Sequence, residues 1–281
     1  VKESRDRVKT ALRNNGFNYP NGHVIINLAP GNLAKSGAGF DLPIALAILQ
    51  ASGQVTIPNV ENTEFIGELG LFGELRGING ILTCALASTK ANRALILPEE
   101  NEQEASLVKT GRLLVAPNLA ELAKYLNGQA TGAVRTPIDT RRKSPPIAAT
   151  NYAQIVGQLN AKRGLLIAAA GGHHLIMLGP PGAGKTMLAR SFVELLPKLK
   201  DQPSLEVATI YSSIGLERAD HTVVPFRDPH HSISSVAMVG GGQRPQPGEV
   251  ALAHKGVLFL DELPHFKPAT LDLLREPIET G

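Results

Sequence analysis

Apolar positions along the chain form two kinds of pattern: short continuous runs, which predict strands, and sets spaced by three and four residues, which predict helices. The runs predict strands at residues 23–28, 94–98, 174–178 and 256–260, and a hairpin at 64–75 that turns at Gly70. The spaced sets predict helices at residues 2–12, 41–51, 82–92, 165–172, 187–196 and 271–278. Strands and helices that follow one another in this way predict an α/β protein.

The periodic pattern is interrupted between the two halves of the chain. Residues 136–150 are polar, contain proline and show no period, so they predict a linker. We therefore expect a first domain at residues 1–135 and a second at 151–281, since 281 residues are enough for two domains.

A glycine-rich sequence lies between the strand predicted at 174–178 and the helix predicted at 187–196. It reads Gly-Pro-Pro-Gly-Ala-Gly-Lys-Thr and matches the phosphate-binding pattern G-x-x-x-x-G-K-[ST]. Its glycines let backbone N–H groups turn toward an anion, and the helix N-terminus adds partial positive charge. Lys185 is expected to reach the phosphates of ATP, and the Thr186 hydroxyl to ligate Mg²⁺. The residues expected to bind the nucleotide are Gly179, Pro180, Pro181, Gly182, Ala183, Gly184, Lys185, Thr186 and Met187.

The strand predicted at 256–260 is followed by two carboxylates, Asp261 and Glu262. In nucleotide hydrolases the first acid of such a pair holds Mg²⁺, and the second can polarise the attacking water. We therefore expect Asp261 to hold the metal together with Thr186, and Glu262 to act as the general base beside Lys185. For this chemistry the glycine-rich loop and the acids need to converge at the C-terminal edge of one parallel sheet.

Both ends of the chain look cut. A helical pattern begins directly after Val1 without an initiator methionine, and the nucleotide domain stops at Gly281, one predicted helix after its metal-binding acid. We therefore expect a fragment of a longer protein, with an incomplete nucleotide-binding module.

Composition limits the partners and the compartment. Basic and acidic residues balance on either side of Arg141-Arg142-Lys143, which accounts for the net charge of +3 and predicts a solvated linker rather than a DNA-binding surface. The single cysteine, Cys84, excludes an internal disulfide and a cysteine-based metal cluster. No apolar run is long enough to span a membrane, and the first residues do not resemble a signal peptide, so we expect a cytoplasmic protein without a membrane partner.

The second half of the chain resembles the AAA+ ATPase module of the magnesium-chelatase branch. The resemblance rests on the phosphate-binding loop and the Asp-Glu pair, on the lead-in Gly157-Gln158, and on the segments at 225–234 and 247–256. It implies a P-loop AAA+ α/β domain over residues 151–281, truncated at its C-terminus, with ATP and Mg²⁺ as cofactors.

The first half resembles the N-terminal domain of ComM/YifB-type chelatase-like proteins, on segments 34–42, 67–73 and 94–101. That domain is similar to the proteolytic domain of Lon and to the C-terminal domain of RadA, which implies a ribosomal S5 domain 2-like α+β fold. The Lon nucleophile and lysine positions align with about Gly39 and Ile81, and neither residue has the required group. The resemblance therefore implies a catalytically dead domain. Lys35 and Ser36 are adjacent, but they lie in a glycine-rich loop and not at the aligned positions.

The order of the two domains is that of the ComM/YifB type. It implies a ring of identical subunits, six by family expectation, that hydrolyses ATP and moves DNA, as in branch migration during recombination or natural transformation. Two alternatives remain open: a magnesium-chelatase motor subunit, against which the first domain argues, and an ATP-dependent protease-like remodeller.

Two sets of side chains invite further roles. The histidines could in principle gather around a metal, but adjacent histidines point to opposite sides of a strand, so structural or interface roles are favoured; these residues are His173, His174, His230, His231, His254 and His265. Arg218, Arg227 and Arg244 are candidates for the arginine finger, but the resemblance implies that this residue lies beyond Gly281, and we assign none of them.

Overall fold

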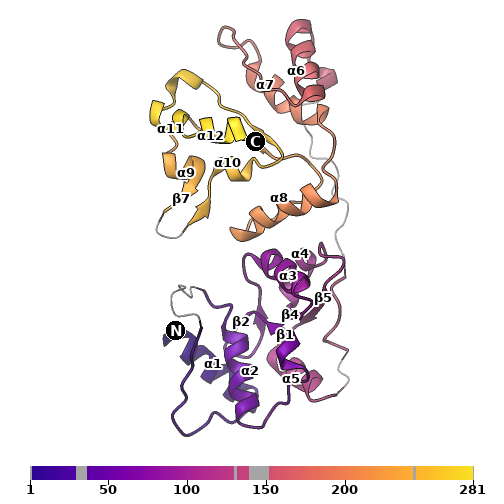
Figure 1. The fold of residues 1–281 in the computed structure, drawn as a ribbon, viewed down its shortest axis with the longest axis vertical. Helices are drawn as coiled ribbons and strands as arrows, with labels where there is room; N and C mark the ends of the chain where they lie inside the picture. The colour runs from indigo at the N-terminus through magenta and orange to yellow at the C-terminus, as the bar shows by residue number, and fades with distance from the viewer. Residues whose placement is uncertain (1, 30–36, 130–131, 139–151, 243–244, 281) are drawn as a thin grey trace. The chain divides into compact units, whose positions relative to one another are not determined.

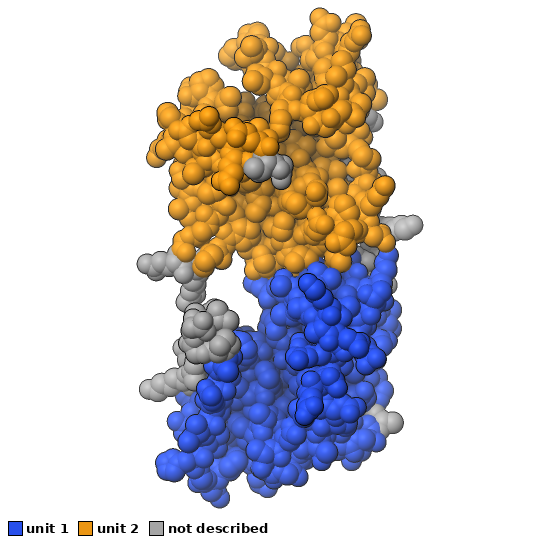
Figure 2. Space-filling view, viewed as in Figure 1, with its two compact units in different colours: residues 1–141 blue, residues 142–281 orange. Residues whose placement is uncertain are grey.

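The computed structural model describes residues 2–29, 37–129, 132–138, 152–242 and 245–280, and it divides the chain into two compact units (Figures 1 and 2). Unit 1 comprises residues 1–141 and unit 2 residues 142–281. Most of the expected linker, including Arg141-Arg142-Lys143, lies outside the described residues. Each unit mixes helices with short strands and contains parallel strand pairs, which agrees with the α/β prediction.

Unit 1 is built on a parallel three-stranded sheet. Its central strand β4 (Ala94–Pro98) lies between β1 (Thr63–Phe65) and β5 (Arg112–Ala116). Residues 95–97 are at most 2% exposed, which is typical of a parallel strand that is covered on both faces. The strand predicted at 94–98 is therefore confirmed.

A hairpin follows β1, as the sequence predicts. Its strands β2 (Glu68–Leu69) and β3 (Leu75–Arg76) pair antiparallel, and the Gly70 N–H donates to the Glu74 carbonyl at 2.9 Å. A Cβ on Gly70 would lie 2.3 Å from the carboxyl carbon of Glu74, so a larger residue at this turn would displace the Glu74 side chain. Residues 64 and 65, predicted to belong to the hairpin, pair with β4 instead.

Helices cover this sheet and carry most of the core of unit 1 (Figure 1). They are α1 (Lys2–Asn14), α2 (Asp41–Ala51), α3 (Ile81–Lys90) and α5 (Leu119–Leu126), with shorter turns at η1 (Val60–Asn62), η2 (Glu99–Asn101) and α4 (Glu102–Ala105). The first three confirm predicted helices. Helix α5 is not among the predicted helices, although its cap carries a local signal: the Asn118 side chain accepts a hydrogen bond from the Glu121 N–H at 2.8 Å.

The strand predicted at residues 23–28 is wrong. The segment has no regular secondary structure, and Ile25 is 90% exposed, although Val24 packs against the core. A strand requires a neighbouring backbone that satisfies its N–H and C=O groups. In the part of unit 1 that the structure describes, no strand pairs with these residues.

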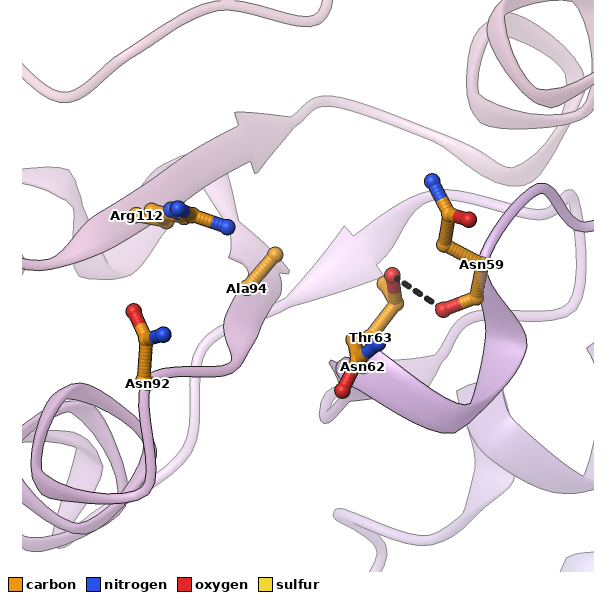
Figure 3. Close-up of a pocket in the computed structure, with 6 residues that line it drawn as sticks. All are labelled: Asn59, Asn62, Thr63, Asn92, Ala94 and Arg112. Atoms are coloured by element: carbon orange, nitrogen blue, oxygen red, sulfur yellow. Dashed lines mark hydrogen bonds between the residues drawn. The ribbon is translucent and has the colours of Figure 1, made fainter.

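A polar hollow lies at the amino-terminal ends of the parallel strands (Figure 3). Its lining residues are Asn59, Asn62, Thr63, Asn92, Ala94 and Arg112, and the Thr63 hydroxyl donates to the Asn59 carbonyl at 3.1 Å. Ligands of parallel α/β sheets bind at the opposite, carboxyl ends of the strands. We therefore assign no function to this hollow.

An ion pair between a half-buried arginine and a buried aspartate joins α1 to α2. Asp41 is 0% exposed, and its carboxylate accepts hydrogen bonds from Arg7 Nε at 2.8 Å and from the second terminal nitrogen of Arg7 at 3.3 Å. The Ser4 hydroxyl donates to the same carboxylate. We expect Arg7→Met to lower the free energy of unfolding of unit 1 by about 3 kcal/mol, because it leaves a buried carboxylate without its cation. Urea unfolding of the chain, followed by circular dichroism, measures this loss.

The exposed pair Arg93–Glu64 is the matched control. Its nitrogen and oxygen are 3.0 Å apart, but the side chains are 49% and 38% exposed. Arg93→Met is expected to cost less than about 1 kcal/mol. Equal losses in the two variants would contradict a special role for the Arg7–Asp41 pair.

Unit 2 is mainly helical, with two small sheets. Strand β6 (Phe226–Arg227) pairs in parallel with β9 (Val257–Leu258), and β7 (Gly240–Gly241) pairs antiparallel with β8 (Gln246–Pro247). The helical elements are η3 (Tyr152–Gln154), α6 (Leu159–Gly171), α7 (Lys185–Ser191), η4 (Phe192–Leu195), α8 (Asp201–Ser213), α9 (Ser235–Val239), α10 (Glu249–Leu252), η5 (Leu263–His265), α11 (Pro268–Asp272) and α12 (Arg275–Thr280). None of the helices in the described ranges is both long and apolar enough to cross a membrane.

The strand predicted at 174–178 is wrong. Residues 173–180 have no regular secondary structure, and Ile176 and Leu178 are 75% and 93% exposed. The reason is the pairing: β9 bonds to β6, and no strand among the described residues of unit 2 lies beside 174–178. An apolar run can become a buried strand only where a neighbour supplies hydrogen bonds and cover.

Other predicted elements of unit 2 are confirmed with changed boundaries. The helix predicted at 187–196 begins at Lys185 and tightens into η4 before Pro197. The strand predicted at 256–260 is reduced to β9, and the helix predicted at 271–278 is divided between α11 and α12. Helix α8 is not among the predicted helices. It begins at Asp201 and carries Pro203 in its first turn, and both residue types are common at helix starts.

Candidate active site

The glycine-rich loop of unit 2 leads directly into α7. Gly182 and Gly184 have φ angles of 77° and 81°, in the left-handed region that glycine adopts without strain. Gly184 is the residue before the helix, and its carbonyl accepts the Leu188 N–H at 2.9 Å. The loop therefore ends at a helix N-terminus, where free N–H groups and the helix dipole favour an anion.

The Lys185 side chain folds back onto the glycine-rich loop and hydrogen-bonds to its backbone. Its Nζ donates to the carbonyl of Gly179 at 2.9 Å and to that of Pro180 at 3.0 Å. These bonds hold the ammonium over the turn in which it is expected to meet phosphate. An incoming phosphate would offer charged acceptors in place of two neutral carbonyls.

Thr186 and Asp261 are brought together by the fold. The Thr186 hydroxyl donates to Asp261 Oδ2 at 2.8 Å, which joins the start of α7 to the turn that follows β9. The expected contact of the loop with the acids is thus observed. It does not lie at the edge of one parallel sheet, because residues 174–178 form no strand. A hydroxyl and a carboxylate are oxygen ligands of the kind that Mg²⁺ takes, so this pair fits the ion.

Glu262 adopts a strained backbone in the turn between β9 and η5. Its φ is 53°, in the left-handed region that is uncommon for residues other than glycine. Its N–H donates to Asp261 Oδ1 at 2.9 Å. The side chain is 58% exposed and faces two imidazoles, with Oε2 at 3.4 Å from His231 Nδ1 and 3.3 Å from His265 Nδ1.

Only part of the histidine set gathers. His231 and His265 meet at Glu262, whereas His254 pairs through Nε2 with Glu206 at 3.1 Å. His230 directs Nδ1 to the Ser232 hydroxyl at 2.8 Å. The histidines were candidates from the sequence, but nothing in the sequence predicts that two of them face Glu262, the expected general base.

The arginine candidates make structural contacts within unit 2. Arg227 binds both oxygens of Glu249 at 2.6 and 2.8 Å, and these hydrogen bonds raise the pKa of Arg227. Arg218 lies 5.0 Å from the centre of the Tyr211 ring, and burial lowers the pKa of its guanidinium. Arg244 lies outside the described residues.

One contact to the loop was missed by sequence reasoning. The Gln158 side chain donates through Nε2 to the Ala183 carbonyl at 3.1 Å. Gln158 has a φ of 52° and immediately precedes α6. The sequence offers Gly157-Gln158 only as part of a family resemblance. Gln158 lies 25 residues before Ala183, so no local pattern predicts the contact between them.

Unit 1 lacks reactive groups at the two positions that align with the Lon catalytic pair. A Cβ built on Gly39 would meet Ile66 and Ile78 at 3.5 Å, so the surroundings of that position are apolar. Ile81 is the first residue of α3 and is 0% exposed. Lys35 and Ser36 lie outside the described residues.

Comparison with known proteins links both units to one family. A family model described as magnesium chelatase, subunit ChlI, matches residues 151–281, and a model described as subunit ChlI of Mg-chelatase matches residues 1–101. The uncharacterized protein YifB of Escherichia coli (strain K12) is 47% identical over the whole chain, which covers 55% of that protein. The competence protein ComM of Haemophilus influenzae is 46% identical over the whole chain, which covers 56% of it.

A more distant relative matches about half of the chain. Lon protease 2 of Bacillus subtilis is 30% identical over 147 residues, which are 48% of this chain and 26% of that protein. The chain thus spans just over half the length of its YifB and ComM relatives and a smaller part of Lon.

Proposed function

Because the chain belongs to the ComM/YifB type of the magnesium-chelatase family, we propose that it is part of an AAA+ motor that binds and hydrolyses ATP with Mg²⁺. The observation that carries the proposal is the 2.8 Å hydrogen bond between Thr186 and Asp261. It joins the end of a phosphate-binding loop to an acid after a strand, which is the arrangement that phosphoryl transfer requires.

The proposed mechanism follows from the positions of four side chains. Lys185 exchanges the carbonyls of Gly179 and Pro180 for phosphate oxygens. Thr186 and Asp261 would hold Mg²⁺, which neutralises charge on the phosphates when bound. Glu262 accepts a proton from the attacking water, and its exposed side chain turns from the two histidines toward the loop to do so.

The two units receive different roles in this proposal. Residues 151–281 form the first part of the AAA+ module, after a linker at 136–150. Residues 1–135 form a Lon-protease-like domain of the ribosomal S5 domain 2-like kind that has lost its catalysis. The apolar surroundings of Gly39 and the burial of Ile81 support this assignment, because neither position offers a nucleophile or a base.

For the complete protein we propose a hexameric ring that moves branched DNA. The support is the 46% identity with a relative whose name is competence protein ComM. The test measures ATP hydrolysis by the full-length protein alone, with linear duplex DNA and with branched DNA. Stimulation by branched DNA above that by the linear control is expected. Turnover that ignores DNA would remove the DNA substrate, and absence of turnover would remove the ATPase.

A second candidate is a chelatase-type motor. The first domain argued against this function, because chelatase motor subunits resemble only the second domain. The match of residues 1–101 to a model described as a chelatase subunit weakens that argument and so favours the second candidate. The full-length protein would then support ATP-dependent insertion of Mg²⁺ into a porphyrin with chelatase partner subunits. Failure in that assay, beside stimulation by branched DNA, would leave the DNA motor.

A further inference from the structure

We propose that His231, Glu262 and His265 form a binding site for a divalent transition-metal ion of the zinc class. The two Nδ1 atoms lie 3.4 and 3.3 Å from Glu262 Oε2. One ligand atom from each of the three residues lies within 4.8 Å of the other two. The three side chains come from two separate segments of unit 2, so the fold assembles the group.

The spacing suits a tetrahedral ion. Zinc binds imidazole and carboxylate at about 2.0–2.2 Å, and tetrahedral ligands at that distance lie about 3.3–3.5 Å apart. Both imidazole–carboxylate separations fall in this range, and the ligand atoms of the two histidines lie within 4.8 Å of each other. The two sites also differ in the metal that they prefer. The imidazole nitrogens of this site suit zinc, whereas the oxygens of the Thr186–Asp261 pair suit Mg²⁺.

Local structure holds the ligands in place. The turn η5 places His265 three residues after Glu262, and the His265 N–H donates to the Glu262 carbonyl at 2.8 Å. The His231 ring lies beside that of His230, with ring centres 4.0 Å apart and planes 35° apart. It also makes an edge contact with Phe266, with ring centres 6.4 Å apart. Phe266 is 3% exposed and anchors this corner in the core. The His231 ring is therefore positioned before any ion binds.

Exposure gives the ion a route to the site. The side chains of His265 and Glu262 are 64% and 58% exposed, and that of His231 is 31% exposed. Three protein ligands leave a fourth position for water. Ions can therefore enter and leave without opening the core.

Occupancy would control hydrolysis, an inference that rests on the proposed role of Glu262 as general base. A carboxylate that ligates zinc has its lone pair engaged by the ion and cannot accept a proton from water. Zinc bound to His231 and His265 would hold Glu262 away from the nucleotide. The site thus acts as a reversible block on the motor.

Direct binding tests the site without any ATPase assay. Zn²⁺ is titrated into the 281-residue chain by calorimetry, and Co²⁺ is used to read coordination from its visible absorption. We expect one site that His265→Ala weakens at least tenfold. His254→Ala is the matched control, because His254 also contacts a glutamate, Glu206, but lies outside the group.

The outcomes separate the possible binding modes. Unchanged affinity in both His265→Ala and His231→Asn, or no binding of Zn²⁺ at micromolar concentration, would overturn the site. A cobalt–thiolate charge-transfer band would assign the ion to Cys84 instead and would also overturn it. Circular dichroism of each variant establishes that it is folded.

A second measurement tests the block in the full-length protein. Zinc should lower ATP turnover, and chelation should restore it. The inhibition factor is the rate without zinc divided by the rate with zinc, measured for each protein. We expect this factor to be at least tenfold smaller in His265→Ala than in the unmodified protein. Inhibition that stays the same in His265→Ala would overturn the block. Absence of turnover without zinc would refute the proposed ATPase and leave the directly measured metal site standing.

Discussion

Replacing Lys185 with alanine is expected to weaken ATP binding by the full-length protein about 100-fold or more. The Lys185 ammonium makes two hydrogen bonds to loop carbonyls, at 2.9 and 3.0 Å, and would offer both to phosphate oxygens. A hydrogen bond to a charged group contributes about 1.5–3 kcal/mol, so the loss of two corresponds to at least a factor of about 100. Calorimetric titration with a non-hydrolysable ATP analogue measures the change.

Lys198 supplies the matched control for this substitution. It lies in the same unit, its side chain is 73% exposed, and its ammonium is 3.4 Å from Asp220. Lys198→Ala should leave the affinity for ATP unchanged, because exposed ion pairs contribute little and Lys198 makes its ion pair with Asp220, outside the loop at residues 179–186. If Lys185→Ala bound the analogue within threefold of the unmodified protein, the loop would not be the phosphate site.

The motifs of the candidate site could be predicted from sequence because their chemistry is local. Eight consecutive residues define the phosphate-binding loop, and an apolar run followed by Asp261-Glu262 defines the acids. Their meeting could be anticipated from a general property of parallel sheets, whose carboxyl ends gather ligands. The Thr186–Asp261 hydrogen bond shows that the loop and the acid meet, but among the described residues only the acids follow a strand of a parallel pair.

Strands were predicted less well than helices, and the reason is their dependence on partners. A helix satisfies its backbone internally, so spacing along the chain carries most of its signal. A strand needs a second segment, which the run itself does not encode. Residues 94–98 found neighbours on both sides, whereas residues 23–28 and 174–178 have the same apolar character and no strand beside them in the described ranges.

The histidine cluster shows the limit of reasoning from adjacent residues. Adjacent histidines point to opposite sides only within a strand. Residues 230 and 231 form no strand, and their ring centres lie 4.0 Å apart. The structure instead unites His231 with His265, which is distant in sequence and reaches Glu262 through the turn η5. No periodicity encodes such a meeting, because it depends on how two separate segments pack.

Replacing Glu262 with glutamine is expected to preserve ATP binding and to lower turnover of the full-length protein by about 100-fold to 10,000-fold. Glutamine has the same length and still accepts and donates hydrogen bonds, but it cannot take the proton of the attacking water. The nucleotide contacts of Lys185 and Thr186 are left in place. Steady-state turnover and affinity for an ATP analogue are measured on the same preparation.

Two comparisons make this result specific to the base. Glu217→Gln changes an exposed glutamate elsewhere in unit 2 and should leave turnover unchanged. His265→Ala removes a neighbour of Glu262 without removing the carboxylate, so hydrolysis should continue where Glu262→Gln stops it. Normal turnover in Glu262→Gln would show that another group activates the water. If Glu262→Gln bound the ATP analogue more weakly, the carboxylate would instead help to hold the nucleotide. A residue that acts only as the base affects the rate of hydrolysis and not the affinity.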